Sequence, residues 1–239
     1  MELAVKNILV SVKNQRSFLK FMKIFVPTRE PCIPIYLLNS FIKYKMNLIN
    51  KGSIESTRNA IIQIALKQKE DIIMLDRDIE PLFEFDLFIK TAEYYFNKGY
   101  DVVCGVYYLK TLTGISAGVS SEKAFQYGLQ PITRDYVWLP YPPNIDLEVD
   151  VCGTGLIAIS YNFLQKIKDD YPWFAVEVSD GEYKIGEDVY FFMKFKPKAI
   201  LAHNLLARHY VDSARYLTPD GFLELSGELK TKEDEKNGG

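Results

Sequence analysis

Two carboxylates, Asp76 and Asp78, have the residue types and spacing of a cation site. They follow residues 71–75, a short apolar run of the kind found in strands buried on both faces of a parallel sheet. Ligands of open α/β sheets bind outside the carboxyl ends of such strands. Paired carboxylates there suit a hard divalent cation that keeps some waters and binds substrate phosphates. Carboxylates two apart also occur within 78–80, 84–86 and 146–150, so it is the position after a strand that distinguishes this pair.

The elements before and after this pair alternate between strands and helices. Strands are expected over 22–28, 46–49, 71–75 and 101–108, because each is short and apolar. Helices are expected from Pro34, from about Ile54 and over 84–97, where Gly99 ends the last of them. The expected apolar faces are Ile35, Leu38, Phe41 and Ile42 in the first helix, and Ile61, Ile64 and Ala65 in the second. This alternation predicts an α/β fold with a doubly wound, mostly parallel sheet and right-handed crossovers.

The character of the chain changes after Lys110. Residues 110–143 are rich in Thr, Gly, Ser and Tyr without helical period, which predicts a smaller antiparallel part of hairpins and loops. The apolar segment 149–159 comes next, followed by a helix from Tyr161 capped by Ser160. After them we expect a flexible loop over 181–186, a helix from Glu187 and a last strand over 199–202. The segment 149–159 contains Gly-Thr-Gly but no third glycine, which argues against a dinucleotide-binding dehydrogenase.

The predicted domain organisation is simple. Residues 1–21 are expected to be an N-terminal extension, because Met22 begins what looks like the first strand. Residues 22–225 form one expected domain, and residues 226–239 are a polar tail expected to be disordered.

Composition restricts the partners. A net charge of -2, from 29 basic and 31 acidic residues, gives no general attraction to nucleic acid or anionic membranes. No signal peptide is evident, and no apolar run has the length of a membrane span. The three cysteines, at 32, 104 and 152, are too scattered for a disulfide framework and include no CxxC pair, so a reducing cytoplasm is the expected location.

Further candidate residues lie at helix starts and late in the chain. Arg58 could direct a guanidinium and a helix N-terminus at a phosphate or base, or it could be a solvated residue after a Ser53 or Ser56 cap. Glu187 and Asp188 could complement the helix macrodipole or supply a catalytic base. His203 and His209 are the two histidines, and each could be a satisfied polar residue or a ligand.

Taken in order, these segments resemble a glycosyltransferase of the GT-A fold, family 2-like and of the compact type seen in viruses and prokaryotes. The matching segments are VPTRE, STRN, DRD, VDVCGTGL, PWF, GEDVYFF and a late histidine, over about residues 22–215. The resemblance implies transfer of a hexose-type sugar from a UDP- or GDP-sugar to an acceptor hydroxyl, with inversion expected. It also implies a divalent metal, Mn²⁺ or Mg²⁺, and leaves the acceptor open.

The resemblance assigns roles to particular residues. Asp76 and Asp78 match the DxD motif, with Asp78 as the direct metal ligand and Asp76 as a ribose or water-mediated metal contact. Arg77 between them would place a cation beside the metal, where it could bind phosphate or weaken metal affinity. His209 matches the late metal-site histidine better than His203, because it is expected to follow the last strand by several residues.

Other roles implied by the resemblance concern the donor, the acceptor and the base. Asp188, with Glu187 beside it, matches the acidic pair that includes the base. Trp173 would face the acceptor. The donor would be held by the nucleoside-binding loop Pro27, Thr28, Arg29 and Glu30, by Arg58 at the base or diphosphate, and by Gly153, Thr154 and Gly155 at the sugar.

Three other functions fit parts of the pattern. A phosphohydrolase of the haloacid dehalogenase type uses the first Asp of Asp-x-Asp as nucleophile, but its motif lies on the first strand and is followed by Thr or Gly-Thr. A nucleotidyltransferase would share the fold and the metal, although a Gly-rich basic phosphate loop is not evident near the start. A binding module that has lost catalysis would keep metal and nucleotide binding without turnover. The chain lacks the QxxRW-like segment of processive synthases, which argues against polymer extrusion.

Overall fold

The computed structural model describes residues 22–28, 34–110, 114–120, 123–124, 136–179, 182–211, 215–218 and 223–225. The predicted extension over 1–21, the predicted tail over 226–239, and Arg29 and Glu30 lie outside these residues. The helices are α2 (Ile35–Tyr44), α3 (Ile54–Gln68), α4 (Phe85–Asn97), α6 (Tyr161–Lys166) and α7 (Glu187–Phe195). The strands are β1 (Lys23–Pro27), β2 (Asn47–Ile49), β3 (Ile72–Leu75), β4 (Ile79–Pro81), β5 (Val102–Val106), β6 (Ala117–Ser120), β7 (Tyr136–Trp138), β8 (Leu147–Val149), β9 (Val151–Cys152), β10 (Leu156–Ile159), β11 (Glu177–Ser179), β12 (Glu182–Ile185), β13 (Ala199–Tyr210), β14 (Arg215–Leu217) and β15 (Leu223–Leu225).

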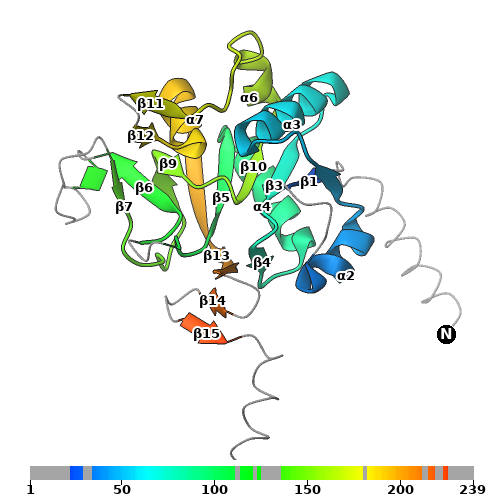
Figure 1. Cartoon of the computed structure of the whole chain (residues 1–239), viewed down its shortest axis with the longest axis vertical. Helices are drawn as coiled ribbons and strands as arrows, with labels where there is room; N and C mark the ends of the chain where they lie inside the picture. The colour runs from blue at the N-terminus through cyan, green and yellow to red at the C-terminus, as the bar shows by residue number, and fades with distance from the viewer. Residues whose placement is uncertain are drawn as a thin grey trace, which may run out of the picture.

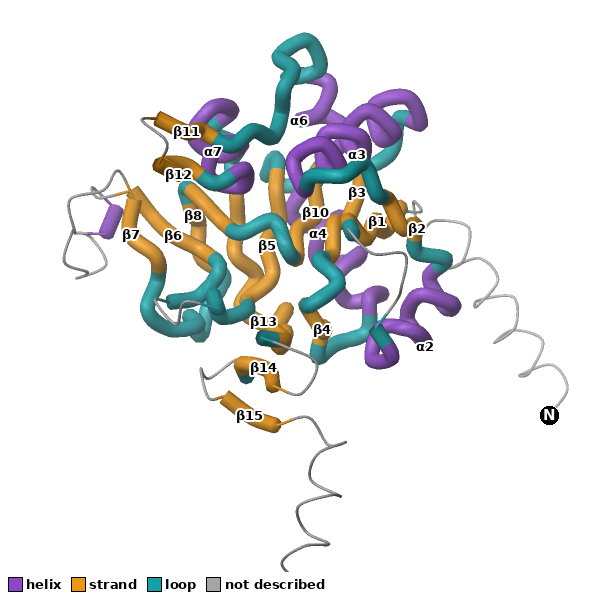
Figure 2. Tube along the Cα trace, in the orientation of Figure 1, coloured by secondary structure: helices purple, strands orange, loops and turns teal. Residues whose placement is uncertain are grey.

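A mixed central sheet confirms the α/β class. Its strand order is β15-β14-β13-β5-β10-β3-β1-β2. The strands from β13 to β1 lie side by side across the middle of the molecule, and β14 and β15 lie below them in the view (Figure 1, Figure 2). Strands β1, β2 and β3 are parallel, as are β5 and β13, but β10 lies between β3 and β5 and is antiparallel to both. The expected alternation therefore holds for the first strands. The sequence pattern does not reveal the antiparallel insertion of β10, since a buried antiparallel strand is as continuously apolar as a parallel one.

Each face of the central sheet packs against its own set of helices. Successive strand residues point to opposite faces, so in β1 Phe25 belongs to one core and Ile24 to the other. The first core also takes residues from α3, α6 and α7, such as Ile61 and Phe191. The second takes residues from α2 and α4, such as Phe88. All four residues of β3 are fully buried, as the apolar run before Asp76 predicts.

The sequence predicts helix positions well, but not every helix face. The Ser53 hydroxyl caps α3 by accepting a hydrogen bond from the backbone N–H of Ser56 at 3.2 Å, as expected. In α2 the predicted face is wrong at two of its four positions: Leu38 is 43% exposed and Ile42 69% exposed, whereas Leu37 is buried. A ten-residue helix with apolar residues on several sides offers alternative faces, and contact with the sheet selects one of them.

The segment 149–159 contains the last residue of β8 and the strands β9 and β10, and the turn at Gly153, Thr154 and Gly155 separates β9 from β10. Two predicted segments have different structures. The loop expected over 181–186 contains β12, which pairs with β11. The last strand runs for twelve residues rather than four, since β13 pairs with β5 and β8 in its first half and with β4 and β14 in its second.

The hairpins expected after Lys110 are present as the antiparallel sheet β7-β6-β9. This sheet is tied to the central sheet by a disulfide between Cys104 of β5 and Cys152 of β9. The sequence predicts no disulfide framework, but it does not predict this single bridge, because Cys104 and Cys152 are 48 residues apart and meet only when the two sheets pack together. In the part of the chain that the structure describes, no helix is both long enough and apolar enough to span a membrane.

Candidate functional site

The Asp76–Asp78 turn connects β3 to β4 at the carboxyl end of β3. Its geometry is held by backbone hydrogen bonds: the Ile79 N–H donates to the Asp76 carbonyl at 3.1 Å. The Asp76 N–H donates to the Gly155 carbonyl at 2.7 Å, and the Tyr210 N–H donates to the Asp78 carbonyl at 2.8 Å. The turn is thus fixed on one side to the loop before β10 and on the other to the end of β13.

Arg58 lies buried between the two predicted acidic motifs. Its Nη2 donates to both carboxylate oxygens of Asp76, each at 3.0 Å, and its Nη1 donates to Glu187 Oε1. The Arg58 side chain is 4% exposed, against 26% for Asp76 and 15% for Glu187. The guanidinium therefore links the end of β3 to the start of α7, although Arg58 and Glu187 are 129 positions apart in the chain.

The neighbour of Arg58 on α3 fixes another part of the surroundings. The side-chain oxygen of Asn59 accepts hydrogen bonds from the N–H groups of Trp173 and Phe174, at 2.9 and 3.0 Å, and its amide donates to the Phe174 carbonyl at 2.7 Å. The Phe174 ring lies 6.0 Å from the Arg58 guanidinium. Arg58 and Asn59 of the STRN segment thus contact other parts of the protein, and the role of Arg58 at a base or diphosphate stays a prediction.

The contacts distinguish Glu187 from Asp188 at the start of α7. Glu187 is engaged in the ion pair with Arg58, whereas Asp188 Oδ1 accepts the N–H of Val189 at 2.7 Å. Burial and the neighbouring Glu187 raise the pKa of Asp188 to about 6, although the charge on Arg58 works against the rise. A carboxylate with a pKa near the working pH can accept a proton efficiently, which suits Asp188 to the role of a base.

The Asp78 carboxylate lies beside a lysine, Lys110, and a histidine, His209. Its Oδ2 lies 2.6 Å from Lys110 Nζ and 3.6 Å from His209 Nε2. Burial alone would raise the pKa of Asp78, but the neighbouring His209 and Lys110 side chains outweigh burial and lower the pKa below its ordinary range. Burial raises the pKa of Asp76, with Arg58 opposing the rise. The two carboxylates of the motif therefore occupy different electrostatic environments.

The residues at Asp78 fit a divalent cation. His209 Nδ1 lies 2.6 Å from the Tyr108 carbonyl oxygen, which can only accept, so Nδ1 carries a proton and Nε2 faces Asp78. A carboxylate oxygen and an imidazole nitrogen are both common metal ligands. Among the described residues there is no group of three or more His, Cys, Asp or Glu side chains placed to hold a metal. A metal here would take Asp78 and His209 and complete its shell with waters and phosphate oxygens.

Two metal-site predictions change in detail. His209 does not follow the last strand, as expected, but lies within β13, opposite Ile79 of β4. That pairing brings it to Asp78. Asp76 is bonded through both oxygens to Arg58, so the geometry favours Asp78 and His209 as the metal ligands and gives Asp76 a place in the ion-pair network. His203 instead hydrogen-bonds to Asp146, at 2.5 Å between Nδ1 and Oδ1.

The loop of Gly153, Thr154 and Gly155 packs against the buried Tyr107 side chain. The Gly155 N–H donates to the Tyr107 hydroxyl oxygen at 3.0 Å, and a Cβ added at Gly155 would lie 2.8 Å from that oxygen. A Cβ at Gly153 would lie 2.4 Å from the same atom. Thr154 is buried, and its hydroxyl oxygen has no hydrogen-bond partner within the described part of the chain. The close approach that requires glycine here is an approach to Tyr107.

The structure places the remaining predicted residues as follows. Pro27 ends β1, and the buried Thr28 beside it donates its N–H to the Ile49 carbonyl at 3.0 Å. The Arg77 carbonyl accepts the hydroxyl of Tyr36. Trp173 is 4% exposed, and its indole N–H donates to the Ile167 carbonyl at 2.8 Å. The predicted contact between Trp173 and an acceptor therefore has no support, because a core position leaves almost none of the ring accessible.

Sequence reasoning misses Lys110 and Tyr107. Tyr107 is buried, and burial together with the charge of Asp76 holds the pKa of its hydroxyl well above the ordinary value. Both residues follow β5, whose neighbour β13 carries His209 and whose neighbour β10 follows the loop that contains Gly155. The available signal was their position just after an apolar strand, where side chains reach the same edge of the sheet as Asp76.

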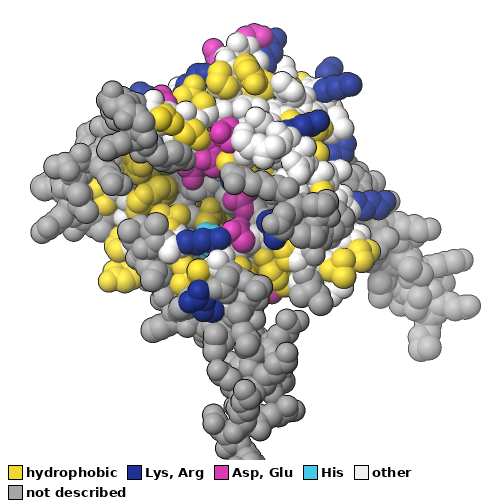
Figure 3. Space-filling view, viewed as in Figure 1, with side chains coloured by type: hydrophobic (Ala, Val, Ile, Leu, Met, Phe, Trp, Pro, Cys, Tyr) yellow, Lys and Arg dark blue, Asp and Glu magenta, His cyan; other side chains and the backbone are white. Residues whose placement is uncertain are grey.

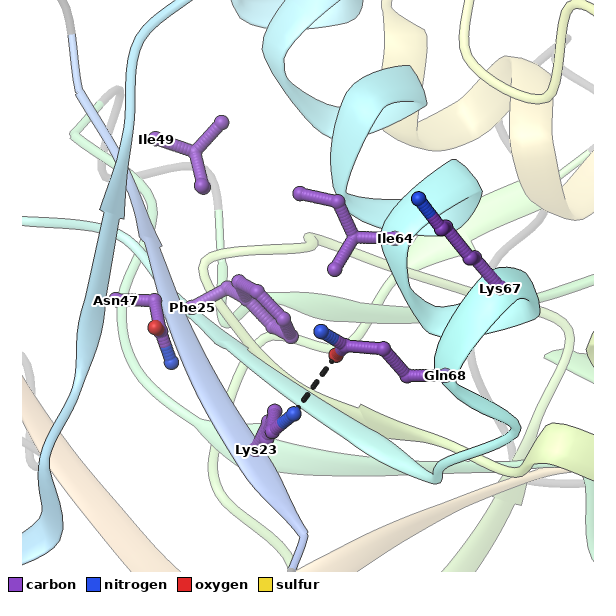
Figure 4. A pocket seen from close by; sticks show the side chains of 7 residues that line it. All are labelled: Lys23, Phe25, Asn47, Ile49, Ile64, Lys67 and Gln68. Carbon is purple, nitrogen blue, oxygen red and sulfur yellow. Dashed lines mark hydrogen bonds between the residues drawn. The ribbon is translucent and has the colours of Figure 1, made fainter.

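A separate hollow of about 350 Å³ lies between α3 and the first two strands. It is lined by Phe25, Ile49, Ile64, Lys23, Lys67, Asn47 and Gln68, with a hydrogen bond from Lys23 to Gln68 (Figure 4). Lys23 is at the first residue of β1 and pairs in register with Ile72, the first residue of β3. The part of the hollow at Lys23 therefore lies at the amino ends of these strands, whereas Asp76 follows the carboxyl end of β3.

The fold and the site together define an α/β protein with a carboxylate-rich site at the carboxyl end of its parallel strands. Acidic side chains gather in a band across the face in view, with a histidine and basic side chains beside its lower part (Figure 3). Among solved structures, the chain is similar to the crystal structure of A197 from STIV, with 30% sequence identity and a TM-score of 0.66. The match covers 86% of this chain and 94% of A197. The chain belongs to the same family as A197. No protein-family model and no curated protein matches the sequence.

Proposed function

We propose that this protein is a metal-dependent glycosyltransferase, which moves a sugar from a nucleoside-diphosphate sugar to an acceptor hydroxyl. One observation carries the proposal: Arg58 joins the aspartates after β3 to the acidic pair that opens α7. A carboxylate suited to a metal, Asp78, and a carboxylate suited to proton transfer, Asp188, thereby belong to one site.

The parts of the site would divide the work of transfer. When bound, a Mn²⁺ or Mg²⁺ ion neutralises charge on the departing nucleoside diphosphate, and Asp78 and His209 are the residues that would hold it. Asp188 would take the proton of the acceptor hydroxyl while the hydroxyl oxygen forms a bond to the anomeric carbon of the donor sugar. The bond from that carbon to the phosphate oxygen breaks in the same step, which inverts the configuration.

Arg58 would act on this chemistry through the protein. It neutralises charge on Asp76 and Glu187, so that these carboxylates can lie close to Asp188 without unbalanced repulsion. It also lowers the pKa of Asp188 against the effects of burial and Glu187. A base kept partly ionised near neutral pH is what proton abstraction from a hydroxyl requires.

The first test is binding of UDP, GDP and their common sugar conjugates, measured by calorimetry with and without Mn²⁺ or Mg²⁺. We expect one nucleoside diphosphate to bind, only in the presence of metal, and the variant Asp78→Ala to lose this binding. Absence of binding by all nucleotides with either metal would remove the proposal, and phosphatase substrates should then be screened.

The second test separates catalysis from binding. Donor hydrolysis, in which water replaces the unknown acceptor, provides a turnover assay. Asp188→Asn should lower the rate by about 100-fold or more while donor affinity stays within about twofold. Asp169→Asn, at an exposed position after α6, is the matched control and should change neither quantity. A full rate in Asp188→Asn would refute the base, and measurable binding with no turnover in the unaltered protein would indicate a binding module.

A further inference from the structure

The carboxylate that is best placed to bind a metal, Asp78, forms an ion pair with Lys110. Lys110 lies on the segment that follows β5, and its Nζ is 2.6 Å from Asp78 Oδ2. The same carboxylate oxygen lies 3.6 Å from His209 Nε2. The Asp78 oxygen that would face a metal between Asp78 and His209 thus already accepts a hydrogen bond from the Lys110 ammonium group.

The two partners of this ion pair, Asp78 and Lys110, differ in how firmly the structure holds them. Asp78 is held by its backbone, because its carbonyl accepts the Tyr210 N–H at 2.8 Å and the next residue, Ile79, pairs with His209 across β4 and β13. The Lys110 side chain is 41% exposed and has a flexible four-carbon stem. If the pair separates, Lys110 is therefore the partner that moves.

A metal ion and the Lys110 ammonium compete for Asp78. Both are cations and would repel each other at this site, where water partly screens the repulsion because the Lys110 and Asp78 side chains are 41% and 35% exposed. Binding of a metal alone must displace Lys110 and leave its charge without this partner. A diphosphate bound to the same metal would bring anionic oxygens to which the displaced ammonium can donate hydrogen bonds.

We propose that Lys110 is a diphosphate-binding residue, which leaves Asp78 for the phosphate oxygens when metal and nucleotide bind together. This inference rests on the proposed function and specifies how its donor is recognised. Metal binding and diphosphate binding would then favour each other. The metal requires Lys110 to leave Asp78, and the diphosphate binds Lys110 in the position away from Asp78.

The test uses Lys110→Met, which keeps much of the length of the stem and removes the charge. Mn²⁺ alone, measured by electron paramagnetic resonance, should bind about fivefold more tightly to the variant, because no ammonium competes for Asp78. UDP in the presence of saturating Mn²⁺, measured by calorimetry, should bind about tenfold more weakly, because a charged hydrogen bond to phosphate is lost. Inorganic pyrophosphate should show the same loss as UDP.

Two controls complete the experiment. Lys198→Met removes an exposed lysine that lies 3.8 Å from Glu148, and it should change neither affinity. Lys110→Arg retains the charge and should preserve most of the UDP affinity. Equal Mn²⁺ affinity, or unchanged UDP affinity, in Lys110→Met would overturn the role of Lys110 while leaving the proposed function intact. Failure of the unaltered protein to bind UDP, GDP or pyrophosphate with Mn²⁺ would overturn both.

Discussion

Replacing Arg58 by methionine should destabilise the protein strongly, because the change leaves two carboxylates without their shared cation. Arg58 donates to both oxygens of Asp76 and to Glu187, and its side chain is 4% exposed. Methionine fills much of the same volume, so the variant tests the loss of charge and hydrogen bonds more than the loss of packing.

The expected magnitude follows from burial. Removing one partner of a buried ion pair typically costs about 3–5 kcal/mol. The partner carboxylates are 26% and 15% exposed, so water can reach part of each, and the lower end of the range, about 3 kcal/mol, is expected. For a protein of this size such a loss lowers Tm by about 6–12 °C.

The variant should also have a characteristic pH dependence. Burial already raises the pKa of Asp76, and loss of the opposing charge of Arg58 would raise it further. A carboxyl whose folded-state pKa lies above its unfolded value destabilises the protein above the folded-state pKa, and the penalty shrinks as pH falls through that pKa. The deficit of Arg58→Met should therefore be smaller at about pH 5 than at about pH 7.

Urea denaturation of both proteins at these two pH values measures the deficit directly. Arg208→Met is the control, since Arg208 pairs with Glu80 at 3.3 Å with side chains 35% and 21% exposed. That pair should contribute less than about 1 kcal/mol. A loss of under about 0.5 kcal/mol in Arg58→Met at neutral pH would refute the reasoning that Arg58 holds the site together.

Three further outcomes are expected. Because Asp188 must be ionised to act as base and its pKa is raised to about 6, kcat for donor hydrolysis should fall as pH drops below about 6; an acidic limb near pH 4 would contradict this. Gly155→Ala places a Cβ 2.8 Å from the Tyr107 hydroxyl and should cost about 1–3 kcal/mol of stability in urea denaturation, whereas an unchanged midpoint would show that Tyr107 yields freely. Full reduction of the Cys104–Cys152 disulfide, checked by thiol titration, should cost about 4 kcal/mol by loop entropy, and equal midpoints for both forms would exclude that contribution.

The sequence determined the local elements and their order. Continuous apolar runs bounded by charges produced the buried strands β1, β3 and β5, and the Ser53 and Ser160 hydroxyls begin helices as predicted. These features depend on residues that are close together in the chain, so they can be recognised from the sequence alone. The sequence also indicated Asp76 and Asp78, since a strand end can be recognised locally.

The tertiary structure decided how the strands pair and which site residues meet. The reversed direction of β10 and the full length of β13 depend on partners far along the chain, and so does the disulfide between Cys104 and Cys152. The pairing of His209 with Ile79 brings an imidazole to Asp78, and no local pattern contains that information. Arg58 and Lys110 acquired their contacts in the same way, because the partner of a charged side chain is fixed only when distant elements pack together.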